Sequence, residues 1–168
     1  ELRTILYESH RAGTIKKHEH ELLDNVFDFS DIAVSQIMTP RSKIFAVDSN
    51  EPYGKAVAKI AASGYVRVPV FKNKIDNVIG ILSIKALLKN LSADTPSDSL
   101  ESLLQKPHFV PNTQRISDLL KQMQKAKIHM AIVIDEHGDV DGIITIEDIL
   151  EEIVGDIEDG ERQEKSLI

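Results

Sequence analysis

Apolar residues recur with a helical period in several stretches of this chain. In residues 15–29 they lie among charged residues at spacings near 3.6, which predicts an amphipathic helix whose apolar stripe packs on another part of the protein. The same period predicts a helix over residues 53–63, with Gly64 as its left-handed C-terminal cap, and another over residues 116–127. Shorter apolar runs separate these helices.

The shorter apolar runs predict strands. Residues 66–71 and 130–134 are rich in β-branched side chains, which favour the pleated surface of a sheet. Polar turns are expected after them, over residues 73–77 and 136–139. A strand followed by a turn and a second buried strand is therefore predicted at two places in the chain.

The whole order of elements occurs twice from Val34 onward. Alignment of Val47 with Val110 sets an offset of 63 residues; one residue is lost in the following turn, after which Gly80 corresponds to Gly142. Self-similarity on this scale indicates a repeated supersecondary unit. Each copy is too small to cover both faces of its own sheet, so the two copies are expected to pack against one another.

The copies close with helices and are joined by a polar segment. Each closing helix is expected to begin at a hydroxyl N-cap, Ser83 or Thr145. Residues 92–99 are polar and contain a proline, so they form a linker that adds to neither core. The predicted fold class is α/β (α+β), with two β-α-β-β-α repeats packed through their sheets. The expected parts are a helical connector at 1–33, a first repeat at 34–91, the linker at 92–99, a second repeat at 100–156 and an acidic tail at 157–168.

Composition and charge narrow the classes of function. The 168 residues include 27 acidic and 20 basic ones, and a net charge of −7 argues against a phosphate-backbone binder, so no nucleic-acid partner is expected. The absence of cysteine excludes a disulfide framework and a thiolate nucleophile, and fits a reducing compartment. No stretch approaches the roughly 18 apolar residues of a membrane span, so this fragment is not expected to insert into a membrane.

Two charged clusters have the composition of metal sites but not the spacing. Residues 147–164 hold nine acidic residues and one base, and a solvated helix face running into a flexible tail is favoured over a cation site. Residues 18–21 read His-Glu-His-Glu, but side chains two apart on a helix point away from each other. No metal site is predicted.

Three stretches carry a resemblance to a known family: VSQIMTPR at 34–41, SGYVRVPVF at 63–71 and TIEDILEEIVGD at 145–156. The two copies resemble a tandem pair of CBS (cystathionine-β-synthase-type) repeats. The three stretches are similar to those of the CorC/hemolysin-type proteins, bacterial relatives of the cyclin M magnesium transport mediators. Residues 27–29 also resemble that family's connector from its transmembrane domain.

The resemblance implies a regulatory role rather than catalysis. It implies a transmembrane domain before residue 1, a place on the cytoplasmic face of the cell membrane, and an adenine nucleotide, ATP or AMP, bound with or without Mg²⁺. The nucleotide would modulate transport or efflux of a divalent cation such as magnesium or cobalt. CBS pairs also imply a homodimer, for which the apolar helix residues Leu87, Leu119, Ile149 and Ile153 are expected to supply exposed faces.

Thr145 and Asp148 suit a ribose site on physical grounds. A threonine at a helix N-cap presents its hydroxyl beside unpaired backbone N–H groups, and an acid three residues later lies on the same helical face. The carboxylate would accept hydrogen bonds from the 2′- and 3′-hydroxyls, and the helix N-terminus would favour phosphate. The alternative is that the two residues only cap the helix.

Other site residues follow from the resemblance. It places Thr39 near the nucleotide, Tyr65 near the base and Arg67 at the phosphates. The adenine is expected in an apolar crevice lined by Val68, Pro69, Ile143 and Ile144. Tyr65 and Arg67 could instead be surface residues of an edge strand, and Arg41 and Lys43 are either phosphate contacts or part of a solvated loop.

Two other functions are weighed against nucleotide binding, an enzyme and a scaffold. An enzyme is disfavoured because the sequence has no Ser/His/Asp set on matching elements and no glycine-rich phosphate loop. A ligand-free dimerisation and scaffolding module is the stronger rival.

The two copies differ at the start of their closing helices. The first copy has Ser83 and Ala86 where the second has Thr145 and Asp148, and an alanine side chain cannot accept a hydrogen bond from a ribose hydroxyl. One high-affinity nucleotide per chain is therefore expected.

Overall fold

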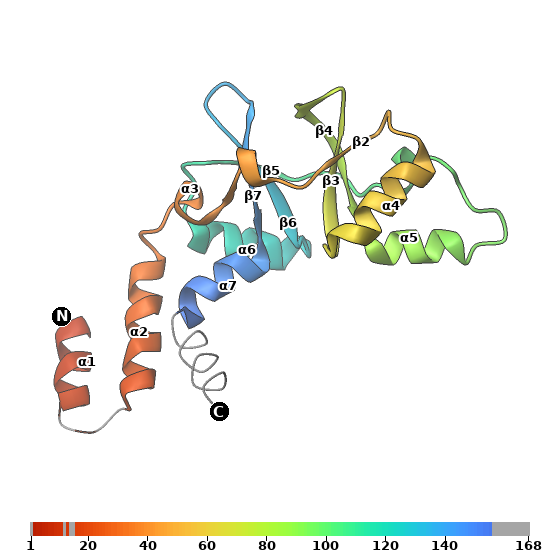
Figure 1. Cartoon of the computed structure of the whole chain (residues 1–168). Coiled ribbons are helices and arrows are strands. Elements are labelled where there is room, and N and C mark those ends of the chain that lie inside the picture. The colour runs from red at the N-terminus through yellow and green to blue at the C-terminus, as the bar shows by residue number, and fades with distance from the viewer. Residues whose placement is uncertain (1, 12, 14–15, 156–168) are drawn as a thin grey trace. The chain divides into compact units, whose positions relative to one another are not determined.

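The structure is a computed structural model of the chain, and it describes residues 2–11, 13 and 16–155 (Figure 1). The described residues form two compact units, each with segments from different parts of the sequence. One contains residues up to Met38, Asn112–His129 and the chain from Ile144; the other contains Thr39–Pro111 and Met130–Ile143. Ile15 and the expected acidic tail at 157–168 lie outside the described residues.

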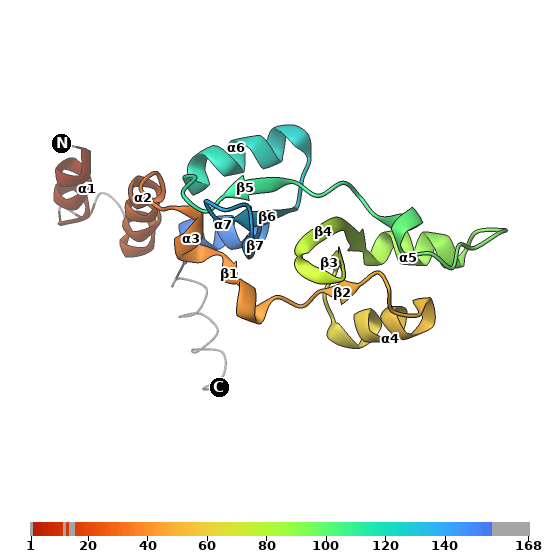
Figure 2. The ribbon, with the colours of Figure 1, turned by 90° about the horizontal axis from the view of Figure 1, so that it is seen from above.

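The second unit contains the sheet of the first repeat. Its three strands are β2 (Val47–Asp48), β3 (Arg67–Lys72) and β4 (Lys74–Ser83), in the order β2-β3-β4. β2 runs parallel to β3, and β4 returns antiparallel to it. Helices α4 (Tyr53–Ser63) and α5 (Ile84–Leu91) run next to this sheet (Figures 1 and 2).

The other sheet contains the strands of the second repeat and one strand from the first. Its order is β1-β7-β6-β5, with β5 parallel to β6. The short strand β1 opens the first repeat but pairs antiparallel with β7 of the second. The bounds are β1 (Thr39–Pro40), β5 (Phe109–Pro111), β6 (Met130–Ile134) and β7 (Val140–Thr145), and the 3₁₀ turns are η1 (Arg41–Lys43) and η2 (Glu101–Leu103).

Strand register confirms the internal repeat. Val47 lies opposite Val70 in the first copy, and Val110 lies opposite Val133 in the second, so the same offset of 63 residues holds on both strands. The fold class is therefore confirmed as two copies of one β-α-β-β-α unit. Gly64 adopts φ 76° after α4, as the predicted left-handed cap requires.

Two apolar clusters form the core of the compact unit that contains Thr39–Pro111 and Met130–Ile143. The first lies within the first repeat, between α4, α5 and the β2-β3-β4 sheet. The second joins the repeats, because Val78 and Ile81 of β4 pack with Met130, Ile132 and Val140 of the second repeat. The prediction that the two copies pack through their sheets is confirmed.

The remaining unit is helical. It contains the long helix expected in the connector, which begins at Lys17 among the described residues, and this helix packs on the closing helix of the second repeat. The Asn25 side-chain amide donates to the carbonyl oxygen of Ile153 at 3.0 Å, which satisfies one of the last carbonyls of that closing helix. The helices are α1 (Leu2–Arg11), α2 (Lys17–Phe29), α3 (Val34–Ile37), α6 (Ile116–Ala126) and α7 (Ile146–Val154).

The hairpin of the first repeat is tighter than the sequence predicts. Residues 73–77 were expected to form a turn, but β4 already begins at Lys74. Asn73 alone reverses the chain, with φ 69°, a conformation that asparagine tolerates better than most residues. The consequence is that Asp76 lies within a strand and not in a loop.

The linker is exposed, as predicted, but it is anchored. Asn90, the buried polar residue at the end of α5, exchanges two hydrogen bonds with the backbone of Ser97, at 2.8 and 2.9 Å, and donates a third to the Tyr53 hydroxyl at 3.0 Å. Further along, Ile81 and Gln105 exchange two backbone hydrogen bonds of 2.9 Å. The chain after the linker thereby lies close against β4.

This close approach gives a testable requirement for glycine at position 80. A Cβ atom on Gly80 would lie 2.6 Å from the Leu104 Cβ and 2.9 Å from the Gln105 carbonyl oxygen. We expect Gly80→Ala to lower the free energy of unfolding by about 1 to 3 kcal/mol, because backbone must shift to relieve the overlap. Urea denaturation measures the change. Gly54→Ala is the control: Gly54 lies in α4 with nothing within 4 Å of its added Cβ, so that variant should be as stable as the parent or more so.

Candidate functional site

The N-terminus of α7 is held by a reciprocal pair of hydrogen bonds between Thr145 and Asp148. The Asp148 backbone N–H donates to the Thr145 hydroxyl oxygen at 3.2 Å, and the Thr145 backbone N–H donates to a carboxylate oxygen of Asp148 at 2.9 Å. This is a capping box, so the predicted cap is present. Both residues are partly exposed. Within the described part of the chain, the second carboxylate oxygen of Asp148 has no hydrogen-bond partner, and it can accept from a ligand.

Two backbone N–H groups in the first turn of α7 already have hydrogen-bond partners. The Ile146 N–H donates to the His129 carbonyl oxygen at 3.1 Å, and the Asp148 N–H is used by the cap. Two of the first-turn amide groups that would cradle an anion are therefore already occupied. The helix end offers a carboxylate to hydroxyl groups more than it offers N–H groups to a phosphate.

The first repeat has the same helix start without the acid. The Ala86 N–H donates to the Ser83 hydroxyl at 3.1 Å, and the Ile84 N–H donates to the Val66 carbonyl oxygen at 2.9 Å. These bonds match those of the second repeat one for one. Because Ala86 stands where the second repeat has a carboxylate, only the second copy can accept hydrogen bonds from a diol at this place.

Tyr65 and Arg67 flank the start of β3. Tyr65 is 55% exposed, and its ring stacks on Phe45 with the centroids 5.5 Å apart and an interplanar angle of 26°. Arg67 is the first residue of β3, lies opposite Ser83 of β4 and is partly exposed. An exposed aromatic face and a guanidinium two residues apart can contact a base and an anion, respectively.

The apolar residues expected to line an adenine crevice are largely buried. Val68 and Ile144 have no exposed surface, and Pro69 is also buried. Val68 packs into the core of the first repeat, because the strand turns this side chain toward α4 and α5. These three residues expose little or no surface in this structure, and their contact with a nucleotide stays a prediction. Ile143 is only partly buried.

Thr39 lies on β1 directly opposite Ile143 of β7. Both residues are partly exposed and belong to the same unit, so the structure brings together two of the predicted site residues from the two repeats. The predicted residues thus fall into three groups within their own units: Thr145 with Asp148, Thr39 with Ile143, and the segment that begins at Tyr65.

Arg41, two residues after Thr39, lies in the exposed 3₁₀ turn η1, yet its guanidinium has partners within the chain. Its guanidinium forms a two-pronged ion pair with Asp76 and also donates to the Val140 carbonyl oxygen at 2.9 Å. The hydrogen bond from Arg41 holds the pKa of Asp76 below its usual range, and the same bond raises the pKa of Arg41. Phe45 and Asp76 are the partners that the sequence did not reveal, because contacts across 20 to 35 residues leave no local pattern.

The charged connector shows ordinary surface contacts. His20 stacks on His10 with ring centroids 4.9 Å apart and lies 3.7 Å from a carboxylate oxygen of Asp24. Among the residues that the structure describes, no group of three or more His, Cys, Asp and Glu side chains has a metal-binding arrangement. In the same part of the chain, no helix has both the length and the apolar character needed to cross a bilayer.

The apolar helix faces differ from those expected. Leu87, Leu119 and Ile149 are 5%, 0% and 0% exposed, so the expectation that they face water is wrong: they pack inside the chain. On α5, exposed apolar side chains lie instead at Leu88, one position after Leu87, and at Leu91, each 60% exposed.

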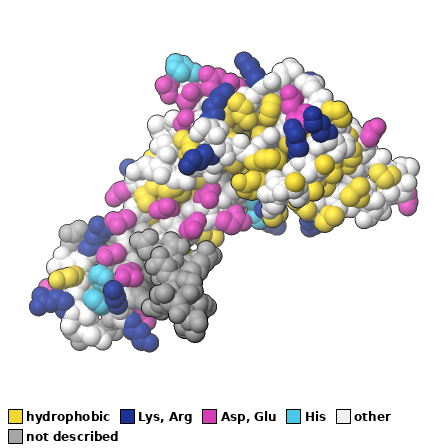
Figure 3. Space-filling view, viewed as in Figure 1, with side chains coloured by type: hydrophobic (Ala, Val, Ile, Leu, Met, Phe, Trp, Pro, Cys, Tyr) yellow, Lys and Arg dark blue, Asp and Glu magenta, His cyan; other side chains and the backbone are white. Residues whose placement is uncertain are grey.

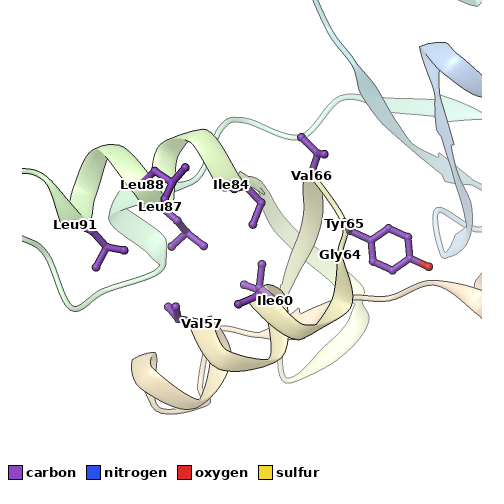
Figure 4. Close-up of a pocket in the computed structure, with 10 residues that line it drawn as sticks. Val57, Ile60, Gly64, Tyr65, Val66, Ile84, Leu87, Leu88 and Leu91 are labelled. Atoms are coloured by element: carbon purple, nitrogen blue, oxygen red, sulfur yellow. The ribbon is translucent and has the colours of Figure 1, made fainter.

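These two leucines line an apolar groove of about 390 Å³ between α4 and α5 (Figure 4). Val57, Ile60 and Val66 also line the groove, while the Tyr65 ring lies at its edge and points away from α5 (Figure 4). Space-filling representation shows hydrophobic side chains gathered over these two helices (Figure 3).

Comparison with known proteins gives consistent matches. The CBS domain family matches residues 34–93 and 100–155. The magnesium and cobalt efflux protein CorC of Pasteurella multocida is 37% identical over 159 residues, and CorC of Escherichia coli is 36% identical over 167 residues. These matches cover 95% and 99% of this chain but 53% and 57% of the relatives, so the chain spans about half the length of the curated relatives it matches.

Solved structures match as well. The CBS domain of a bacterial CNNM/CorC family Mg²⁺ transporter has a TM-score of 0.86 at 32% identity, and the match covers 92% of this chain and 94% of that one. The same type of domain in complex with ATP has a TM-score of 0.75 at 34% identity, covering 82% and 97%. A CBS-domain pair from Klebsiella pneumoniae with bound AMP has a TM-score of 0.67 at 30% identity, covering 74% and 99%.

The ion pair of Asp76 predicts a specific dependence of stability on pH. Because the folded-state pKa of Asp76 is lowered, its contribution to stability is present above the unfolded-state pKa, about 3.9, and is lost as the pH falls through the folded-state value. We expect Asp76→Asn to be less stable than the parent at pH 7, with the difference shrinking below about pH 4. Urea denaturation at a series of pH values measures this. Asp94→Asn, on the exposed linker, should show no such difference, and a gap for Asp76→Asn that stays constant from pH 7 to pH 3 would contradict the assignment.

Proposed function

Because this chain belongs to the CBS-domain family, and within it to the CBS pairs of the CNNM/CorC type, we propose that it is the cytoplasmic regulatory part of a larger membrane protein. In this proposal it binds an adenine nucleotide, ATP or AMP, and modulates transport or efflux of divalent cations such as magnesium and cobalt. The matched relatives are about twice as long as this chain, which leaves room for a transmembrane domain. The nucleotide complexes of two structural neighbours support the choice of ligand.

The observation that carries the proposal is the half-occupied carboxylate of Asp148. One oxygen closes the cap of α7, and the other is available to the vicinal hydroxyls of a ribose. A carboxylate fixed in this way has lost its rotamer freedom before the ligand arrives, so less entropy is lost on binding. The capping role and the binding role are therefore compatible, and the first can serve the second.

The remaining residues have complementary roles in this proposal. Tyr65 contacts the base with its exposed ring, Arg67 pairs with the phosphates, and Thr39 lies near the nucleotide from β1. Val68, Pro69, Ile143 and Ile144 line the apolar crevice for the adenine, with Val68 and Ile144 fully buried in the chain without ligand. Because Ala86 replaces the acid in the first repeat, the proposal assigns one high-affinity nucleotide to each chain.

The contact between α2 and α7 supports a route for the signal. The nucleotide would bind at the N-terminus of α7, while α2, part of the connector toward the membrane domain, packs on the same helix. A ligand that prefers one arrangement of α7 and α2 would shift the population of that arrangement by its difference in affinity. The rival function, a scaffold without ligand, predicts no nucleotide binding, and an enzyme would turn ATP over.

Replacement of Asp148 tests the proposed site. Asp148→Ala should weaken ATP and adenosine binding alike by about 1.5 to 3 kcal/mol, the size of hydrogen bonds to a charged acceptor. Asp148→Asn retains an oxygen that can accept from the Thr145 N–H, so it should keep the cap and the melting temperature but still lose affinity. Titration calorimetry and thermal unfolding separate the two effects.

Two companion variants sharpen this test. Arg67→Ala should weaken the binding of ATP much more than the binding of adenosine, because adenosine has no phosphate with which Arg67 could pair. Glu147→Gln, the exposed neighbour on α7, should leave both affinities unchanged. If the Asp148→Ala variant bound ATP with the affinity of the parent, the proposed site would be wrong.

The proposed homodimer uses the α4–α5 groove in place of the buried residues first expected. An open apolar groove with two leucines each 60% exposed is stabilised when a second copy covers it. Leu88→Glu with Leu91→Glu should convert a dimer to a monomer in sedimentation velocity at about ten micromolar. Lys89→Glu, on the same helix but outside the groove, should remain dimeric; a dimer that survives the double leucine replacement would show that the interface lies elsewhere.

A further inference from the structure

Arg41 and Asp76 form the centre of a hydrogen-bonded node. The Arg41 guanidinium contacts both carboxylate oxygens of Asp76, one of them at 3.0 Å, and donates to the Val140 carbonyl oxygen at 2.9 Å. The Val140 N–H in turn donates to Asp76 at 3.2 Å. The node therefore closes a ring that joins both backbone groups of Val140 to the two charged side chains.

The node connects three distant segments of one compact unit. Arg41 belongs to η1 after β1, Asp76 to β4 of the first repeat, and Val140 to the start of β7 of the second. Exposed ion pairs contribute little to stability in general, but a two-pronged arginine–carboxylate pair fixes geometry as well as charge. The Asp76 side chain is 21% exposed, so the pair is partly shielded from water.

β1 needs such a device because the strand is very short. It has two residues, and its register rests on Thr39 opposite Ile143 and Pro40 opposite Gly142. Proline has no backbone N–H, so it cannot donate to the ladder. Few ladder hydrogen bonds are left to hold Thr39 in place, and the first residue after the strand is Arg41.

We infer that Arg41 and Asp76 are positioning residues for the nucleotide site, which hold Thr39 of β1 against β7 without touching the nucleotide. This inference rests on the proposed function, in which Thr39 lies near the ligand. Arg41 fixes the C-terminal end of β1 because it bonds both to Asp76 of the first repeat and to the Val140 carbonyl oxygen of the second. Asp76 acts through Arg41 and through the Val140 N–H. The competing reading is that Arg41 contacts the phosphates itself.

The affinity test compares three ligands on three variants. The variants are Arg41→Met, Asp76→Asn and the double variant. In each of them the affinities for ATP, AMP and adenosine should fall by one common factor, about three- to tenfold, because all three ligands share the site that Thr39 borders. The double variant should bind no more weakly than the weaker single variant, because the two residues act as one unit. Glu101→Gln, which breaks the exposed Lys72–Glu101 ion pair of the same unit, is the matched control and should bind as the parent does. Calorimetry at a temperature well below unfolding measures all four.

A second readout does not depend on ligand. Hydrogen exchange of the peptide that covers Thr39 should be faster in Arg41→Met and Asp76→Asn than in the parent and in Glu101→Gln. A parent that binds no nucleotide would contradict the proposed function, while faster exchange at Thr39 would still support the pinning of β1. Loss of ATP but not adenosine binding in Arg41→Met would make Arg41 a phosphate ligand and overturn the inference. Variants that melt earlier but keep parental affinities and parental exchange at Thr39 would overturn it too.

Discussion

The apolar contact between the two repeats is the constraint on which the rest of this structure depends. β4 of the first repeat and β6 and β7 of the second share one cluster, in which Val78 and Ile81 meet Met130, Ile132 and Val140. Neither sheet can cover that face alone, because each repeat has helices enough for only one side. The shared cluster brings β1 onto β7 and gives Arg41, Asp76 and Val140 a common meeting point.

Local signals in the sequence predicted most of the fold. The repeat offset, the caps at Ser83 and Thr145 and the left-handed Gly64 all depend on residues within one turn or on regular spacing, and the structure has them where expected. The hairpin at Asn73 was predicted too long, because a polar run such as 73–77 is compatible with either a loop or an exposed strand edge.

The candidate site was predicted less completely, for two physical reasons. Contacts such as Tyr65 on Phe45 or Arg41 on Asp76 join residues far apart in sequence, and no periodicity records them. Burial on a two-sided sheet also depends on which layer covers each face. Leu87 is predicted on an exposed helix face, yet it lies in the core that α4 and α5 cover.

In the proposed function, the two copies of one motif differ through one carboxylate at the start of the closing helix. Ser83 and Thr145 cap their helices in the same way, with hydrogen bonds of 3.1 and 3.2 Å, so the local fold does not distinguish them. Only the carboxylate of Asp148 gives one copy an acceptor for a diol, and Ala86 leaves the other without one. Titration of ATP into the parent protein measures this difference most directly. The account predicts one nucleotide per chain, whereas two equivalent sites per chain, or no binding at all, would contradict it.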